Sequence, residues 1–265
     1  MPDGNAEHFP GPIHQPPLVA NVDAIQPHEQ AEHAHHPQLQ HHFDDMAQQV
    51  EASTLGMWVF LVTEIMFFGG LFTAYLVYRH ANPEGFAEAS HHLNVTWGAV
   101  NTIVLIVSSL TMALAVRSAQ LNQRKATVNW LLLTMLLGAV FLGVKVIEYA
   151  DKFEHHHVPG PHFVWAEAGH EAPVSSSHGV SPDEPNFQLH TQIFFSLYFT
   201  MTGLHALHMI IGLGIMTWLL VTALKDRYDS DYYTPVEVAG LYWHFVDIVW
   251  IFLFPLLYLI GAHAA

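Results

Sequence analysis

Apolar residues fall in five long runs along this chain, and polar residues gather between the runs and ahead of them. The runs cover approximately residues 55–78, 95–116, 128–149, 191–224 and 238–260. A helix of about 20 residues crosses the hydrocarbon core of a bilayer. We therefore predict an all-α integral membrane bundle of five transmembrane helices. The fourth run is long enough to extend beyond the bilayer, tilt or bend, and it contains three glycines at which neighbouring helices could approach closely: Gly203, Gly212 and Gly214.

Two polar segments accompany the apolar runs. Residues 1–50 form a tail rich in His and Pro without Lys or Arg, and we expect it to be mostly disordered, with a helix beginning near Asp44. The tail lacks a positive region ahead of an apolar core, so it does not fit a secretory signal peptide. Residues 51–265 form the predicted membrane domain, with a long external loop at about 151–190. Both segments are rich in histidine, and we interpret them as hydrated polar sequence; metal binding is the alternative. The histidines concerned are His33, His35, His36, His41, His42, His155, His156, His157, His162, His170 and His178.

The distribution of basic residues predicts the orientation of the helices. Cytoplasmic loops carry an excess of Lys and Arg. With five spans, one side of the membrane receives Arg79 and Lys152. The side that also holds the N-terminus receives Arg117, Arg124, Lys125, Lys225 and Arg227. We therefore expect a cytoplasmic N-terminus and a C-terminus outside.

Composition narrows the class of protein further. Charged residues make up 12% of the chain and hydrophobic residues 51%, whereas a soluble globular protein has about 25% charged residues. The formal net charge of −15 argues against nucleic acid as a partner, because nucleic-acid binding needs basic patches. The absence of cysteine excludes a disulfide-stapled scaffold and a thiolate-bound metal or iron–sulfur centre.

Ionisable residues inside the predicted spans carry the candidate chemistry, because a charge at bilayer depth costs about 2.5–3.5 kcal/mol on insertion scales. Glu64 has no basic residue within one helical turn. It is either a proton-uptake element or partner contact, or a buried group that bonds to another helix. Lys145 and Glu148 are spaced i,i+3 and share a helix face. We expect a structural ion pair, with a lipid-headgroup contact as the alternative.

Two further i,i+3 pairs involve histidine. His205 and His208 could hold a metal only with a third ligand from another helix, and polar contacts between helices are the simpler interpretation. His244 and Asp247 could pair with each other, since a carboxylate stabilises a charged imidazole. Such a pair would relay protons or fix the docking of helices. Trp243 and Trp250 are expected in the core of the bundle.

Motifs of self-contained active sites are absent. The sequence has no nucleophile elbow, phosphate-binding loop, cysteine pair or His-Glu-x-x-His motif. We therefore predict no catalytic residue and no metal ligand set in this chain.

Four segments resemble subunit III of the haem–copper terminal oxidases, and the resemblance extends over residues 52–262. These segments are LGMWVFLVTEIMFFGG at 55–70, GVKVIEY at 143–149, FFSLYFTMTGLHALHMIIG at 194–212 and YWHFVDIVWIFLFPLLYL at 242–259. The resemblance is to the short, five-helix bacterial form. It lacks the first two of the seven helices of the mitochondrial form, so we expect extra helices of subunit I or a small subunit in their place.

The resemblance implies a function that the composition does not. Subunit III binds no haem and no copper; haem a, haem a3 and copper lie in partner subunits, and structural phospholipids are expected. Subunit III packs on subunit I, stabilises subunit I and supports proton uptake by it. The resemblance implies that Glu64 takes part in this support of proton uptake. It implies structural or lipid-contacting roles for Glu148, His205, His208, His244 and Asp247, and we expect the same of Lys145.

Three classes of function follow from this interpretation. We expect a non-catalytic subunit III of a proton-translocating aa3-type cytochrome c oxidase in aerobic respiration, in the bacterial cytoplasmic membrane. Its expected partners are subunit I, subunit II and small subunits, in an oxidase that stands alone or belongs to a respiratory supercomplex. Subunit III of a quinol oxidase is the nearest alternative. A stand-alone membrane transporter or metal-binding membrane protein is an alternative of a different class.

Overall fold

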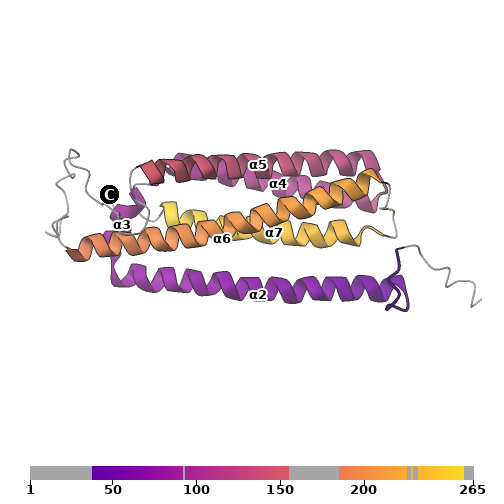
Figure 1. The fold of residues 1–265 in the computed structure, drawn as a ribbon, viewed down its shortest axis with the longest axis horizontal. Coiled ribbons are helices and arrows are strands. Elements are labelled where there is room, and N and C mark those ends of the chain that lie inside the picture. The colour runs from indigo at the N-terminus through magenta and orange to yellow at the C-terminus, as the bar shows by residue number, and fades with distance from the viewer. Residues whose placement is uncertain (1–37, 92, 155–184, 226–227, 229–231, 260–265) are drawn as a thin grey trace, which may run out of the picture. The chain divides into compact units, whose positions relative to one another are not determined.

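The computed structural model describes residues 38–91, 93–154, 185–225, 228 and 232–259. Five of the helices in this part are long and apolar enough to cross a membrane, which confirms the predicted all-α class and the five spans (Figure 1). The helices are α2 (Met46–Ala81), α3 (Pro83–His91), α4 (Val95–Gln120), α5 (Arg124–Glu154), α6 (Pro185–Leu224) and α7 (Thr234–Phe254), and α7 continues into the π-helical segment η2 (Pro255–Leu259).

The chain divides into two compact units, residues 1–46 and 47–265. In the described end of the first unit, the backbone N–H of Phe43 donates to the carbonyl of Gln40 at 3.0 Å. The rings of His41 and His42 meet edge to face at 5.2 Å. The other histidines proposed as metal ligands, in the tail and in the 151–190 loop, lie outside the described residues.

The helices extend past the apolar runs that predicted them. α2 begins at Met46, close to the predicted start near Asp44 and ahead of the apolar run that starts at residue 55, because a helix can continue into polar sequence once it has left the hydrocarbon core. α6 has 40 residues, about 60 Å at 1.5 Å per residue, and so it exceeds the thickness of a bilayer. The nine-residue helix α3 was not predicted, because it is too short to produce a clear apolar period.

Local residues explain where α4 begins and ends. The side chain of Asn94 accepts a hydrogen bond from the backbone N–H of Trp97 at 3.2 Å, as an N-cap residue does. After α4, Asn122 adopts a positive φ of 54°, a conformation that Asn tolerates better than most residues. The N–H of Gln123 then reaches the carbonyl of Ser118 at 2.8 Å. This closes a tight turn into α5 and places α4 and α5 side by side (Figure 1).

Helix α7 is the most buried of the five spans. In the apolar stretch of α7 that would cross the membrane, 56% of the residues are buried, whereas the corresponding stretch of α2 has 11% of its residues buried. Trp243 and Trp250 are both fully buried, as expected, and each is tied to α4. The indole N–H of Trp243 donates to Ser108 Oγ at 3.0 Å, and that of Trp250 donates to Thr102 Oγ1 at 3.1 Å. The tryptophans of α7 therefore fix the rotation of α7 against α4.

Helix α2 contacts the rest of the membrane domain through large side chains. The ring of Phe68 lies 5.3 Å from the ring of His208 and 6.2 Å from that of Phe245. The hydroxyl of Tyr75 donates to the carbonyl of Leu256 at 2.8 Å. Much of the surface of α2 remains apolar and exposed, which fits a helix that borders lipid or another protein.

Only one of the three glycines expected to bring helices together does so. A Cβ on Gly212 would lie 2.9 Å from the Trp243 ring, so this glycine permits a close approach. A Cβ on Gly203 would meet only Tyr149 at 3.9 Å, and one on Gly214 would meet no atom within 4 Å. The expectation was wrong for Gly203 and Gly214, because small residues permit contact only on the face that a neighbouring helix covers.

Candidate functional site

A buried ionic cluster joins α5, α6 and η2. Lys145 Nζ lies 2.8 Å from Glu148 Oε2, which is the predicted i,i+3 contact. Two tyrosines from elsewhere complete the cluster: Lys145 donates to Tyr258 Oη at 2.9 Å, and the hydroxyl of Tyr198 donates to Glu148 Oε1 at 2.8 Å. The Lys145 ammonium also lies 4.9 Å from the centroid of the Trp250 ring. Buried charges need such partners, so the cluster fixes the packing of three elements.

His205 lies beside this cluster in a fully apolar position. Its ring packs at 5.4 Å from Phe141 and 5.2 Å from Trp250. Neither ring nitrogen has a hydrogen-bond partner among the described residues. The ring of His208 contacts Phe68 on α2 instead, so the two histidines pack against different aromatic side chains although they are three residues apart.

His208 reaches across to α2 instead and meets Glu64. Nδ1 of His208 lies 2.8 Å from the carbonyl oxygen of Leu204. A carbonyl oxygen only accepts hydrogen bonds, so Nδ1 carries a proton. Nε2 of the same ring lies 3.2 Å from Glu64 Oε2. A hydrogen bond between Nε2 and Oε2 needs one further proton. If the imidazole holds it, the two side chains form an ion pair; if the carboxyl holds it, both side chains are neutral.

The expected pairing of His244 with Asp247 is wrong. Nδ1 of His244 lies 2.7 Å from Oγ of Ser109 on α4. Neither carboxyl oxygen of Asp247 has a hydrogen-bond partner in the described chain, although the side chain is buried. The i,i+3 spacing put both residues on one face of α7, but α4 also lines that face and supplies the hydroxyl that His244 contacts.

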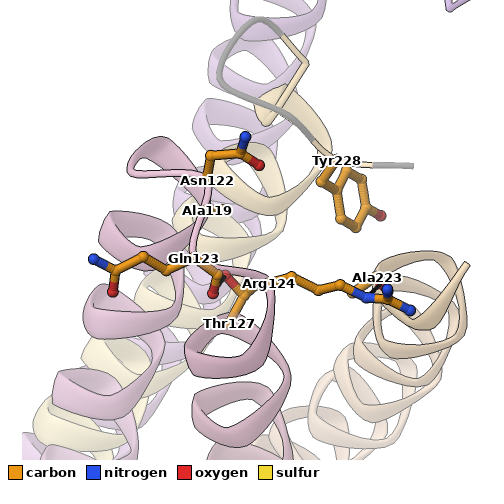
Figure 2. A pocket seen from close by; sticks show the side chains of 7 residues that line it. All are labelled: Ala119, Asn122, Gln123, Arg124, Thr127, Ala223 and Tyr228. Atoms are coloured by element: carbon orange, nitrogen blue, oxygen red, sulfur yellow. Dashed lines mark hydrogen bonds between the residues drawn. The ribbon is translucent and has the colours of Figure 1, made fainter. Parts of the chain in front are cut away.

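A small pocket lies where the α4–α5 turn meets the end of α6 (Figure 2). Arg124 donates from Nε to the carbonyl of Ala223 at 3.1 Å and from Nη2 to the carbonyl of Leu224. These bonds satisfy carbonyl groups that the end of a helix leaves unpaired. Burial raises the pKa of the nearby Tyr228 phenol to about 12. The pocket volume of about 10 Å³ suits one water molecule. We therefore interpret this region as a structural contact that holds the start of α5 against the end of α6.

Sequence reasoning missed the residues that complete these contacts: Ser109, Tyr198 and Tyr258. The two tyrosines lie in apolar runs, and a buried tyrosine hydroxyl usually finds a hydrogen-bond partner. Their presence in the runs could therefore have indicated partners for Lys145 and Glu148. In the part of the chain that the structure describes, no group of three or more His, Cys, Asp or Glu side chains is placed to hold a metal ion. Of the polar contacts between helices, the Glu64–His208 pair joins two groups that can each take up a proton, whereas His244 meets a neutral hydroxyl.

Comparisons with known proteins place this bundle in a family. The family model of cytochrome c oxidase subunit III matches residues 38–158 and 178–262. The chain is 33% identical over 210 residues to cytochrome c oxidase subunit 3 of Corynebacterium diphtheriae, covering 78% of this chain and 87% of the relative. It is 29% identical over 230 residues to quinol oxidase subunit 3 of Bacillus subtilis, covering 87% and 98%. The chain therefore belongs to the subunit III family of the haem–copper oxidases.

Proposed function

We propose that this chain is the non-catalytic subunit III of an aa3-type cytochrome c oxidase, and that Glu64 supports proton uptake by the complex. The observation that carries the proton role is the contact of Glu64 with His208 across α2 and α6. An ionisable side chain in a membrane span is costly and usually functional. The pair holds one exchangeable proton between Nε2 and Oε2, so it can accept and release a proton without disturbing the helix backbone.

The position of the pair suits exchange with its surroundings. The side chains of Glu64 and His208 are 19% and 13% exposed, whereas Lys145 and Glu148 are almost fully enclosed. A group with partial access can exchange protons with water or with a neighbouring subunit, which an enclosed cluster cannot do. This difference supports the proposed proton exchange at Glu64 and the proposed structural role of the Lys145–Glu148 cluster.

The experiment compares Glu64→Gln with the wild-type complex over a range of pH. The amide of Gln still bonds to Nε2 of His208 but offers no titratable proton, so we expect normal assembly and a turnover that falls at alkaline pH, where protons are scarce. Glu84→Gln is the matched control, because Glu84 is an exposed carboxylate of α3 outside the five spans. Equal turnover of the Glu64→Gln and wild-type complexes at every pH would remove the proposed proton role.

The remaining parts of the proposal concern location, partners and electron donor. The excess of basic residues on one side supports a cytoplasmic N-terminus in a bacterial cytoplasmic membrane. Direct contact with subunit I and bound phospholipids would cover the exposed apolar faces of the helices.

The proposed electron donor is cytochrome c. Identities of 33% and 32% to cytochrome c oxidase subunit 3 of Corynebacterium diphtheriae and Alkalihalophilus pseudofirmus support cytochrome c as donor. Oxidation of added quinol but not of reduced cytochrome c by the purified complex would identify a quinol oxidase instead.

A further inference from the structure

A groove between α4 and α7 combines an apolar rim with a polar floor. It has a volume of about 350 Å³ and opens on the outside of the bundle. Ile106 and Leu110 of α4 and Ile248 of α7 line it, and each is at least half exposed. Ser109, His244 and Asp247 also line it, and none of these three is exposed.

Asp247 is left without a hydrogen bond inside the described chain. Its side chain is buried, with 2% of the residue exposed, and neither carboxyl oxygen has a hydrogen-bond partner. Ser109 lies near enough to the carboxyl for a weak hydrogen-bonding interaction, but neither carboxyl oxygen makes a contact of hydrogen-bond geometry, and Oγ of Ser109 lies 2.7 Å from Nδ1 of His244. A buried carboxyl without a partner is strongly disfavoured. The groove therefore fits a ligand that brings its own hydrogen-bonding group.

The depth of the groove decides which ligand can supply that group. Asp247 lies midway along the span Thr234–Leu259, and Ser109 lies near the middle of Val95–Gln120. Both are therefore about 20 Å from the ends of their spans. Lipid headgroups lie at the edges of a hydrocarbon core about 30 Å thick and do not reach this depth. Acyl chains do reach it, but they carry no hydrogen-bonding atoms.

We propose that the α4–α7 groove is the docking site for a transmembrane helix of another oxidase subunit, which places a hydrogen-bond donor side chain against Asp247. This inference rests on the proposed function, because it takes the partner from the oxidase complex. A helix suits the groove in both respects. Its apolar side chains cover Ile106, Leu110 and Ile248, and a hydroxyl, amide or indole group on it satisfies the carboxyl.

The first test is photo-crosslinking in the assembled complex. The photoreactive residue p-benzoylphenylalanine replaces Ile248 at the groove and, as a control, Leu136 on α5, which is exposed, in mid-span and outside the groove. Illumination should link position 248, and not position 136, to a transmembrane segment of another oxidase subunit. Adducts of position 248 with phospholipid alone, or with a second copy of this chain alone, would overturn the inference.

The second test asks whether Asp247 itself holds the partner. Asp247→Leu should lower the retention of this chain in the detergent-solubilised complex about tenfold, the worth of one hydrogen bond to a charged or polar group. Asp247→Asn should restore retention, because its amide oxygen still accepts. Unchanged retention of Asp247→Leu would contradict the inference. Adequate amounts of both variants in the membrane show that they fold.

The two proposals fail in different ways. If the chain purifies without any haem-bearing subunit, the proposed function fails and the inference about the groove fails with it. If the chain purifies with haem-bearing subunits but position 248 reacts only with lipid, the proposed function stands and the groove is not the docking site.

Discussion

Replacing Gly138 by Ala would add a methyl group against the ring of Trp243. The new Cβ would lie 2.8 Å from Cη2 of the ring, and a second glycine, Gly212, also borders the ring, since a Cβ added there would lie 2.9 Å from Cζ3. The ring is fully buried and its N–H is fixed to Ser108 at 3.0 Å. The indole therefore cannot move aside without disturbing α4, α5, α6 and α7 together.

The expected cost follows from two opposing terms. Overpacking a well-packed core costs about 1–3 kcal/mol, whereas Ala is favoured over Gly within a helix by about 1 kcal/mol. Gly143→Ala is the matched control on the same helix, because a Cβ there would meet no atom within 4 Å. The control gains the helix term alone, so Gly138→Ala should be less stable than Gly143→Ala by about 1–3 kcal/mol.

Thermal unfolding of the detergent-solubilised complex, followed by tryptophan fluorescence at one scan rate, measures this difference. At 2–4 °C per kcal/mol for a domain of this size, Tm of Gly138→Ala should lie about 2–12 °C below that of Gly143→Ala. Gly212→Ala and Gly214→Ala form a second pair with the same expected order, because Gly214 faces open space. Equal Tm values within both pairs would refute the close packing around Trp243.

Two further predictions concern the ionic cluster and Tyr228. Lys145→Met should destabilise the protein by about 3–5 kcal/mol, because it leaves Glu148 buried without its cation, and the double variant Lys145→Met, Glu148→Leu should recover most of the loss in the same thermal assay. The pKa of Tyr228 is raised to about 12 in the folded protein, against about 10 in the unfolded chain. The neutral phenol therefore makes its full contribution to the free energy of unfolding below about pH 10, and this contribution is lost as the pH rises through about 12. Ultraviolet titration of wild type and Tyr228→Phe should therefore differ only near pH 12, and a difference near pH 10 would contradict the burial of this phenol.

The sequence predicted the spans well because one physical requirement sets them. A bilayer demands about 20 apolar residues for each helix, and that length is visible without any knowledge of contacts. The contact of Lys145 with Glu148 was predictable for a similar reason, since i,i+3 spacing fixes it within one helix. Features of this kind depend on neighbours in the chain alone.

Contacts between helices could not be predicted in the same way. Glu64 bonds to His208, which is 144 residues away, and His244 contacts Ser109 on α4 rather than Asp247 on its own helix. α2 and α6 are apolar on all sides, so their sequences do not show which face packs inward. The rotation of each helix depends on side-chain shape, such as the fit of the Trp243 ring between Gly138 and Gly212.

A reduced-minus-oxidised visible spectrum of the complex that co-purifies with this chain from native membranes, taken before and after the chain is stripped off, tests the central claim most directly. Membership of the subunit III family together with the proposed aa3 type predicts a haem a signal that stays with the larger partner. Haem or copper that leaves with this chain would contradict the claim and make His205, His208 and His244 ligand candidates. The absence of haem from both fractions would contradict it equally and favour a transporter.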